Sequence, residues 1–219
     1  MNDRFGIVYP KVKSYLYGLL RPRDALLTEI EKDAEENDVP IIGPLAGSVL
    51  TMIAARAKRG LEIGTATGYS GILLGRPISR NSGRLITIER DPTKYRIAQR
   101  NFQRAGIAKS VRILEGDAKV IVTEMAKKQN KFDLIFLDVG EKSLYIDLFE
   151  PCISLLRKGG YLIADNALSG GQVAEPSDKD INVVATRKFN KMVYSDKRLL
   201  PLIIPLRDGV MVALKVSTR

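Results

Sequence analysis

Acidic residues stand at the ends of four short apolar runs in this 219-residue chain. Glu89, Asp138 and Asp165 come directly after three of these runs, and Asp117 follows the fourth run after two intervening residues. Open α/β sheets bind their ligands beyond the carboxyl ends of their strands. If the runs are strands, these acids are candidates for ligand contact rather than solvated surface groups.

A glycine turn lies upstream of the acids. Residues 62–71 read EIGTATGYSG, and the turn follows an apolar run and opens a helical segment. Free backbone N–H groups and the dipole at a helix start favour an anionic group, and Gly64 and Gly68 let a ligand approach the backbone. The same pattern can also form a tight strand–helix turn that binds no ligand.

Three aligned features favour a nucleoside site over an empty turn. Glu89 lies 25 residues after Gly64, at the end of the next run, where an acid can accept hydrogen bonds from both ribose hydroxyls. Asp117 is placed one run further, to accept from an adenine amino group. For S-adenosylmethionine, the methionine carboxylate would meet the helix start, with the Ser70 hydroxyl and local amides as donors. The predicted cofactor site consists of Glu62, Gly64, Gly68, Tyr69, Ser70, Glu89, Arg90, Asp117, Ala118 and Asp138.

A nicotinamide dehydrogenase would share this geometry. Such enzymes normally carry Gly-x-Gly-x-x-Gly, whereas this chain reads Gly64-x-x-x-Gly68 with Ala66 between. The end of the chain argues the same way, because two apolar runs, 199–206 and 210–216, are joined by a hairpin signal at Arg207-Asp208-Gly209. Methyltransferase sheets characteristically finish with such a hairpin.

The elements that must position these residues alternate along the chain. From Leu61 onward, short apolar runs are separated by helical segments, which predicts βαβ units. Upstream, Asp24 can cap a helix that reaches about Glu36, and apolar residues repeat at helical spacing over 42–57, with Gly60 as the expected C-cap. We predict one α/β domain over 1–219, with N-terminal helices over 1–59 and a Rossmann-like core over 60–219. The core should hold a mainly parallel seven-stranded sheet that ends in an antiparallel hairpin.

Composition excludes several kinds of chemistry. The chain has no histidine and one cysteine, Cys152, so an internal disulfide, a cysteine-based zinc site and Ser-His-Asp or Cys-His catalysis are all ruled out. Any bound metal must rely on oxygen ligands, which favours Mg²⁺ or Ca²⁺. Cys152 falls on the apolar face of a helical segment and is interpreted as a core residue.

The net charge of +10 is concentrated in two segments, 76–112 and 179–219. Basic faces attract phosphate-bearing partners such as RNA or CoA esters. A solvated, thermophilic surface is an equally good interpretation, because no aromatic-rich stacking motif accompanies the charge. No membrane span is evident, and the first residues, MNDRFGIVYPK, lack a signal-peptide core. We expect a cytoplasmic protein with no membrane partner.

Almost the whole chain resembles a known family, the metal-dependent O-methyltransferases that include catechol and caffeoyl-CoA O-methyltransferases. The motifs that carry the resemblance are Tyr15-Leu16, Val39-Pro40-Ile41, LEIGTATGYSG, TIERD, EGDA, LIFLDV, LLRKGGYLIADNALSGG and RDGVMVALK. The LEIGTATGYS block is typical of class I methyltransferases, and FLD combined with GGYLIADN is more specific for this family. The resemblance implies a Rossmann-like methyltransferase fold, S-adenosylmethionine as the methyl donor and a homodimer.

By this resemblance, Asp138, Asp165 and Asn166 match the family's metal ligands. Two carboxylates and one amide oxygen suit Mg²⁺ or Ca²⁺ and leave positions for substrate oxygens. The alternative for Asp165-Asn166 is a turn after a strand, and Asp138 on a neighbouring strand favours the metal. A metal would lower the pKa of the acceptor hydroxyl and fix its oxygen in line with the methyl–sulfur bond.

The chain departs from the family's pattern after Asp138. The family usually reads Asp-Ala-Asp-Lys and then Tyr, whereas this chain reads Asp138-Val139-Gly140-Glu141-Lys142 and then Tyr145. The second acid is missing and the lysine is displaced by one residue. Lys142 is therefore a candidate base, acting beside Asp138, if the loop carries an insertion, and a surface lysine is the alternative.

These observations together predict an S-adenosylmethionine-dependent, divalent-metal-dependent O-methyltransferase. The expected acceptor is a hydroxyl of a small catechol-like or related molecule. The alternative acceptor is a hydroxylated base in RNA, which would fit the two basic segments and could also offer adjacent oxygens to the metal.

Overall fold

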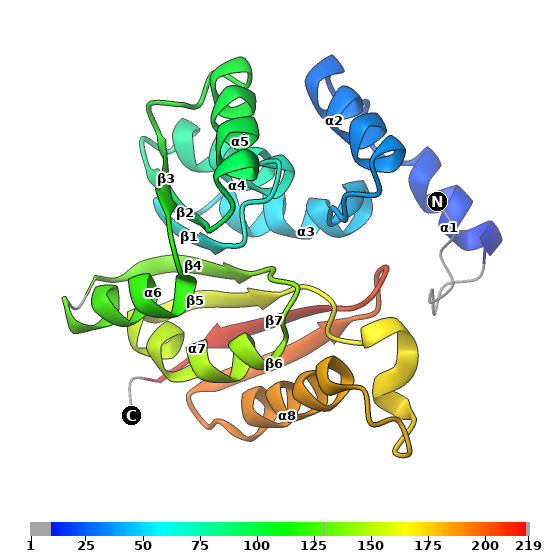
Figure 1. The fold of residues 1–219 in the computed structure, drawn as a ribbon, viewed down its shortest axis with the longest axis vertical. Coiled ribbons are helices and arrows are strands. Elements are labelled where there is room, and N and C mark those ends of the chain that lie inside the picture. Colours follow the sequence, from blue (N-terminus) through cyan, green and yellow to red (C-terminus); the bar gives the residue numbers. More distant parts are fainter. Residues whose placement is uncertain (1–9, 129, 218–219) are drawn as a thin grey trace.

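A computed structural model describes residues 10–128 and 130–217, and within them seven strands form one sheet in the order β3-β2-β1-β4-β5-β7-β6 (Figure 1). The strands are β1 Arg59–Ile63, β2 Arg84–Glu89, β3 Val111–Glu115, β4 Phe132–Leu137, β5 Leu156–Ala164, β6 Leu199–Ile204 and β7 Val210–Lys215. Strand β7 pairs antiparallel with β5 and β6, and the other neighbouring strands pair in parallel. This confirms the predicted α/β Rossmann-like fold with its C-terminal hairpin.

The parallel strands end in register. Ile63, the last residue of β1, lies opposite Ile88 of β2 and Leu137 of β4, and Leu137 in turn lies opposite Ala164 of β5. The residues that follow these strands therefore emerge side by side at one edge of the sheet, as the sequence analysis required.

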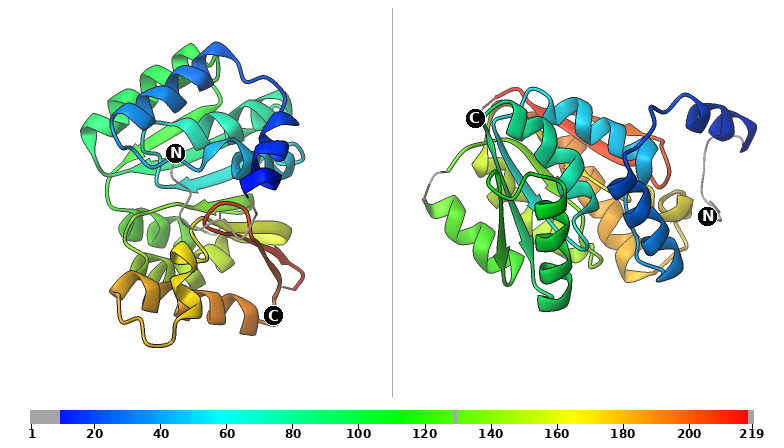
Figure 2. Two further views of the ribbon diagram at one scale, coloured as in Figure 1. Left: turned by 90° about the vertical axis from the view of Figure 1, so that its right-hand side faces the viewer. Right: turned by 90° about the horizontal axis from the view of Figure 1, so that it is seen from above.

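Helices cover both faces of the sheet, with α3, α4 and α5 on one face and α6, α7 and α8 on the other (Figures 1 and 2). Their bounds are α1 Pro10–Gly18, α2 Ala25–Glu36, α3 Gly43–Ala54, α4 Tyr69–Arg80, α5 Pro92–Arg104, α6 Ala118–Lys127, α7 Ser143–Leu155 and α8 Ile181–Ser195, with a 3₁₀ segment η1 at Ser169–Ala174. Two helices start at acidic caps, and the cap at Asp24 is the one that the sequence predicts. The side chain of Asp24 accepts from the N–H of Leu27, and that of Asp91 accepts from the N–H groups of Thr93 and Lys94.

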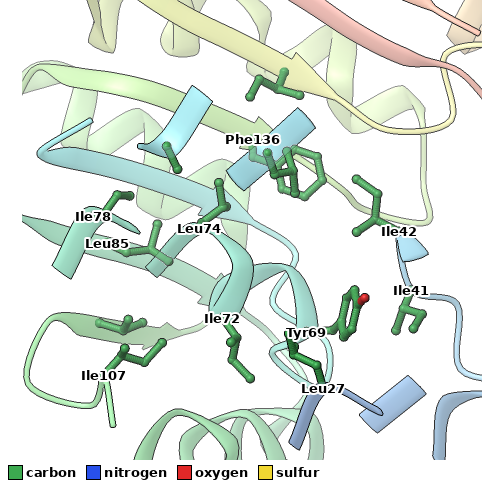
Figure 3. Close-up of a cluster of buried hydrophobic side chains, with 14 of the residues drawn as sticks. Leu27, Ile41, Ile42, Tyr69, Ile72, Leu74, Ile78, Leu85, Ile107 and Phe136 are labelled. Atoms are coloured by element: carbon green, nitrogen blue, oxygen red, sulfur yellow. The ribbon is translucent and has the colours of Figure 1, made fainter. Parts of the chain in front are cut away.

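The buried apolar residues form one cluster on each face of the sheet. Successive side chains of a strand point to opposite faces, so Phe136 joins the cluster under α3 and α4 while Leu137 joins the cluster on the opposite face. Figure 3 shows that Leu27 and Ile41, from the N-terminal part of the chain, belong to the first cluster. Helix α2 is thus anchored by apolar burial, which also holds the segment before α3 in a fixed place.

Three details differ from the sequence analysis. The prediction of Gly60 as a helix C-cap is wrong, because α3 ends at Ala54 and Gly60 is a residue of β1. A Cβ atom on Gly60 would come within 2.9 Å of the side chains of Ile78 and Leu85, so glycine here permits close packing of α4 on the sheet. Strand β1 begins at Arg59, two residues before the apolar run that starts at Leu61. Helix α1, which buries none of its residues, gave no apolar stripe to recognise.

Every helix in the described part of the chain is too short or too polar to cross a membrane. Residues 1–9, which make up most of the stretch considered for a signal peptide, lie outside the described residues.

Candidate cofactor and acceptor site

A cavity of about 350 Å³ lies across the carboxyl ends of the parallel strands. Residues that follow β1 to β5 line it, together with Pro40 and Ile41 from before α3 and Arg207 from the loop between β6 and β7. The predicted site residues in this lining are Gly64, Glu89, Arg90, Asp117, Ala118, Asp138, Lys142, Asp165 and Asn166. Four other predicted residues, Glu62, Gly68, Tyr69 and Ser70, are not part of it.

The turn after β1 depends on glycine geometry. Gly64 has a φ of +101°, and a Cβ atom there would lie 1.8 Å from the backbone oxygen of Asp138. Gly68 has a φ of +89° at the start of α4. Both angles lie in the left-handed region that glycine adopts without a steric cost. The glycines therefore let the turn pass close to β4 and bend sharply into the helix.

Backbone donors fix the carboxylate of Glu89. One oxygen accepts from the N–H of Ala66 at 2.9 Å, and the other accepts from the N–H groups of Arg90 and Asp91, both at 2.9 Å. The side chain is 9% exposed and lines the cavity. The glycine turn and the end of β2 thus hold this acid in one orientation in the wall of the cavity.

Asp117, Ala118 and Arg90 line the same end of the cavity as Glu89. Asp117 also caps α6, because one of its carboxylate oxygens accepts from the N–H of Val120 at 3.0 Å. This helix cap fixes the direction of the side chain. Asp117, which is predicted to contact adenine, therefore caps a helix and also lines the cavity.

Tyr69 and Ser70 line a small adjoining cavity together with Thr67 and Asp138. The Tyr69 hydroxyl donates to a carboxylate oxygen of Glu31 at 2.6 Å. Burial and the neighbouring Glu31 raise the pKa of Tyr69, so the phenol stays protonated as a donor. This bond ties the start of α4 to α2.

Glu62 lies beneath the turn with none of its surface exposed. The Thr87 hydroxyl donates to its carboxylate at 2.6 Å, and Thr87 is also hydrogen-bonded to Thr65 of the turn. Burial raises the pKa of Glu62 to about 7, against the opposing effect of hydrogen bonds from Ser70 and Thr87. The sequence analysis assigned Glu62 to direct cofactor contact. The side chain lies outside the lining of the large cavity and supports the turn, and its direct contact with the cofactor stays a prediction.

Two buried acids lie at the other end of the cavity. Burial and the nearby charge of Asp165 raise the pKa of Asp138 to about 8. Asp165 is 2% exposed, and burial raises its pKa as well. Within the described residues, one carboxylate oxygen of Asp165 is buried without a hydrogen-bond partner. Such an atom costs free energy unless a proton or a cation accompanies it.

Lys142 reaches this acidic pair despite its displaced position in the sequence. It precedes α7 and is 7% exposed. Its ammonium group donates to the carbonyl of Val139 at 2.8 Å, to the Tyr145 hydroxyl at 3.0 Å and to the amide oxygen of Asn166 at 3.0 Å. Burial lowers the pKa of Lys142, and the charges of neighbouring acids oppose that shift. The path of the loop thus leaves the lysine inside the site.

The hairpin loop before β7 completes this end of the cavity. The amide nitrogen of Asn166 donates to the carboxylate of Asp208 at 3.0 Å. Arg207 lines the cavity and lies 3.8 Å from a carboxylate oxygen of Asp165. The sequence analysis used both hairpin residues only as a turn signal. Their presence in the site follows from the position of β7 next to β5, which the motif alone did not specify.

The donor atoms at this end are compatible with a hard cation. In the described part of the chain, no three Asp, Glu or Cys side chains gather in a way that could hold a metal ion. A metal between Asp138 and Asp165 would therefore need the amide oxygen of Asn166 as its third protein ligand. That oxygen now accepts from Lys142, whereas the free oxygen of Asp165 is available. Two carboxylates and an amide oxygen match the ligands that Mg²⁺ and Ca²⁺ prefer.

Cys152 is fully buried, and burial raises the pKa of its thiol to about 12. The interpretation of this residue as part of the core is therefore confirmed.

Comparisons with known proteins agree with this geometry. A family model described as O-methyltransferase matches residues 23–216. A catechol O-methyltransferase from Niastella koreensis is 34% identical over 198 residues, which cover 88% of this chain and 87% of the relative. An O-methyltransferase from Bacillus cereus, solved in complex with SAH, is 28% identical with a TM-score of 0.84, over 94% of this chain and 97% of the other. TomG, an O-methyltransferase of tomaymycin synthesis from Streptomyces achromogenes solved with SAM, is 29% identical with a TM-score of 0.83, over 99% and 100%.

Proposed function

The chain belongs to the O-methyltransferase family and uses S-adenosylmethionine as its methyl donor, and from this premise we propose that it methylates one hydroxyl of a small catechol-like acceptor with the help of a divalent metal. The observation that carries the proposal is the position of Lys142. Its amine donates to the amide oxygen of Asn166 at one end of the cavity, and Glu89 lines the other end. A small-molecule acceptor is what this family uses.

The donor would occupy the end of the cavity formed by Glu89 and Asp117. The fixed carboxylate of Glu89 offers acceptors for both ribose hydroxyls, and Asp117 and Ala118 are available to the adenine ring. The methionine part would lie along the glycine turn, near Ser70. These roles are supported by the lining of the cavity and by the motif match over 62–71.

The transfer itself needs one proton acceptor and correct alignment. The acceptor oxygen attacks the methyl carbon, the carbon–sulfur bond breaks with its electron pair passing to sulfur, and the hydroxyl proton passes to the neutral amine of Lys142. Burial favours that neutral amine, because it disfavours the charged form. General base catalysis of this kind contributes on the order of 10² to 10⁴ in rate.

Asp138, Asp165 and Asn166 would hold the metal. Bound there, a divalent cation would lower the pKa of the acceptor hydroxyl and orient its oxygen. The free oxygen on Asp165 supports this assignment. Alignment of the acceptor against the donor supplies the rest, because holding two reactants in register removes much of the entropic part of the barrier.

A methyl-transfer assay with labelled S-adenosylmethionine tests the proposal. The panel contains catechols and total RNA, each with Mg²⁺ or with EDTA. We expect labelling of catechols that EDTA abolishes and Mg²⁺ restores, while calorimetry shows unchanged binding of S-adenosylhomocysteine in EDTA. Turnover that persists in EDTA would remove the metal from the proposal. Labelling confined to RNA and lost at moderate salt would identify RNA as the acceptor in place of a catechol, because phosphate contacts make RNA binding steeply salt-dependent.

We also propose that the protein acts as a homodimer. Helix α1 extends away from the sheet and buries none of its residues, and Tyr15 on it is 66% exposed (Figure 2). Apolar side chains in that setting suit a partner surface. Light scattering after size-exclusion chromatography should give twice the mass of one chain, and the mass of one chain would contradict the proposal.

A further inference from the structure

Arg207 marks the end of the cavity opposite the donor acids. It lies in the loop before β7, and in the sheet β1, β4 and β5 stand between β7 and β2, the strand that Glu89 ends. Asp138, Asp165 and Lys142 belong to this same end and lie between Arg207 and the donor acids, because they follow β4 and β5. A molecule that places its hydroxyl beside Lys142 can therefore extend in the direction of Arg207, away from the donor.

The guanidinium of Arg207 has unused hydrogen-bonding capacity. Among the described residues its charged partner is Asp165, at 3.8 Å, which is too long for a hydrogen bond, and its side chain is 30% exposed. Lys142, in the same lining, donates three hydrogen bonds to protein oxygens. The two cations of this region thus differ, since one is fully engaged and the other presents a fork of five N–H donors.

The loop that carries Arg207 is held by the segment that follows β5. The N–H of Leu168 donates to the carbonyl of Asp208 at 2.9 Å, and the N–H of Ala167 donates to the carbonyl of Gly209 at 2.9 Å. Arg207 itself has a φ of +53°, in the left-handed region that is unfavourable for a residue with a side chain. Such a conformation persists where the surroundings impose it, so the arginine is directed at the cavity by anchored backbone.

An anion with two oxygens in one plane matches such a fork. Arginine pairs with a carboxylate through two parallel N–H···O bonds, and a hydrogen bond to a charged group contributes about 1.5 to 3 kcal/mol. We propose that Arg207 is a specificity-determining residue that selects an acceptor bearing a carboxylate in addition to the hydroxyl that is methylated. This inference rests on the proposed function, and it names the acceptor as an aromatic hydroxy acid rather than a neutral phenol.

Binding calorimetry tests the inference without turnover. The ligands are 3,4-dihydroxybenzoate and its neutral methyl ester, titrated into protein saturated with S-adenosylhomocysteine, with Mg²⁺ and again with EDTA. We expect the acid to bind the wild type at least about 10-fold more tightly than the ester, from one charge-assisted pair. The ratio should fall close to one in Arg207→Gln, keep an intermediate value in Arg207→Lys, and stay unchanged in Lys158→Gln. Lys158 is an exposed cation near the start of β5, remote from the cavity.

The outcomes separate the inference from the function on which it rests. Equal affinity of acid and ester for the wild type would overturn the role of Arg207, and so would a preference that survives in Arg207→Gln. A preference lost in EDTA and retained in Arg207→Gln would assign the carboxylate to the metal and also overturn it. Methyl transfer to neutral catechols with no Arg207-dependent selectivity would leave the proposed function standing alone. Failure of S-adenosylhomocysteine to bind would instead count against the function.

Discussion

The two ends of the cavity are built in different ways. At the donor end, backbone groups do most of the positioning, because Glu89 is held by three N–H groups and the turn takes its shape from Gly64 and Gly68. At the acceptor end, charged side chains crowd together, and burial shifts the pKa values of Asp138, Asp165 and Lys142. The shape of the donor end is therefore fixed by the backbone. The properties of the acceptor end depend on the charges of a few side chains, which single substitutions can change.

The strongest test of the donor end replaces Gly64 with alanine. The new Cβ atom would lie 1.8 Å from the backbone oxygen of Asp138, at a φ of +101°. Strain and the clash together should cost more than about 3 kcal/mol. We expect a large fall in melting temperature and loss of S-adenosylhomocysteine binding, measured by scanning calorimetry and titration.

Gly106→Ala is the matched control, because Gly106 also has a positive φ, +71°, but its Cβ atom would meet nothing within 4 Å. This variant should lose about 1 kcal/mol of stability, because alanine is strained at a positive φ even where it has space. If both variants lose the same stability and both bind the donor, the close approach of the turn to β4 has no importance.

The corresponding test of the acceptor end is Lys142→Met. Removing the amine should lower kcat by about 10² to 10⁴, the range for loss of a general base. S-adenosylhomocysteine should bind as before, since Lys142 contacts the acceptor end. Steady-state kinetics and calorimetry check the two halves of this expectation.

Lys142→Arg separates charge from proton acceptance, because a guanidinium stays charged at any working pH. It should be about as inactive as Lys142→Met. Recovery of activity in the arginine variant would mean that Lys142 supplies only a positive charge, and that the proton leaves by another route.

Glu89→Ala tests the donor end through its affinity for the ligand. Two hydrogen bonds to a charged acceptor are lost, each of about 1.5 to 3 kcal/mol, so S-adenosylhomocysteine affinity should fall about 100-fold or more. Glu115→Ala is the control, because Glu115 lies opposite Glu89 at the end of β3 but is exposed and not in the cavity lining. Equal affinity in both variants would remove Glu89 from the ribose site.

The same contrast explains what could be predicted from the sequence. The turn and Glu89 are local features, because a glycine spacing and an acid after an apolar run specify their own geometry. The acceptor end depends on Arg207 and Asp208, which come from a hairpin some forty residues beyond Asp165. Their contribution requires knowing that β7 inserts beside β5. Lys142 could be predicted as a candidate, but only the path of the loop decides whether its amine faces the cavity. For Glu62, the motif specifies the strand and not the face of the strand on which the side chain lies.

Glu62 offers the subtlest test, because burial raises its pKa from 4.5 to about 7. A folded state that holds a proton more tightly than the unfolded chain loses stability as the pH rises between those two values. One pKa unit corresponds to about 1.4 kcal/mol, so the effect is at most about 3 kcal/mol. Glu62→Gln cannot ionise and should escape this loss.

The measurement is urea unfolding of wild type and Glu62→Gln from pH 4.5 to pH 8. The free energy of unfolding of the variant, relative to wild type, should rise steadily up to about pH 7 and then level off. Glu115→Gln, which removes an exposed carboxyl, should run parallel to wild type. Parallel curves for Glu62→Gln would mean that this acid ionises as easily in the folded protein as in water. The donor end would then rest on glycine geometry and the fixed carboxylate of Glu89 alone, without a neutral acid beneath the turn.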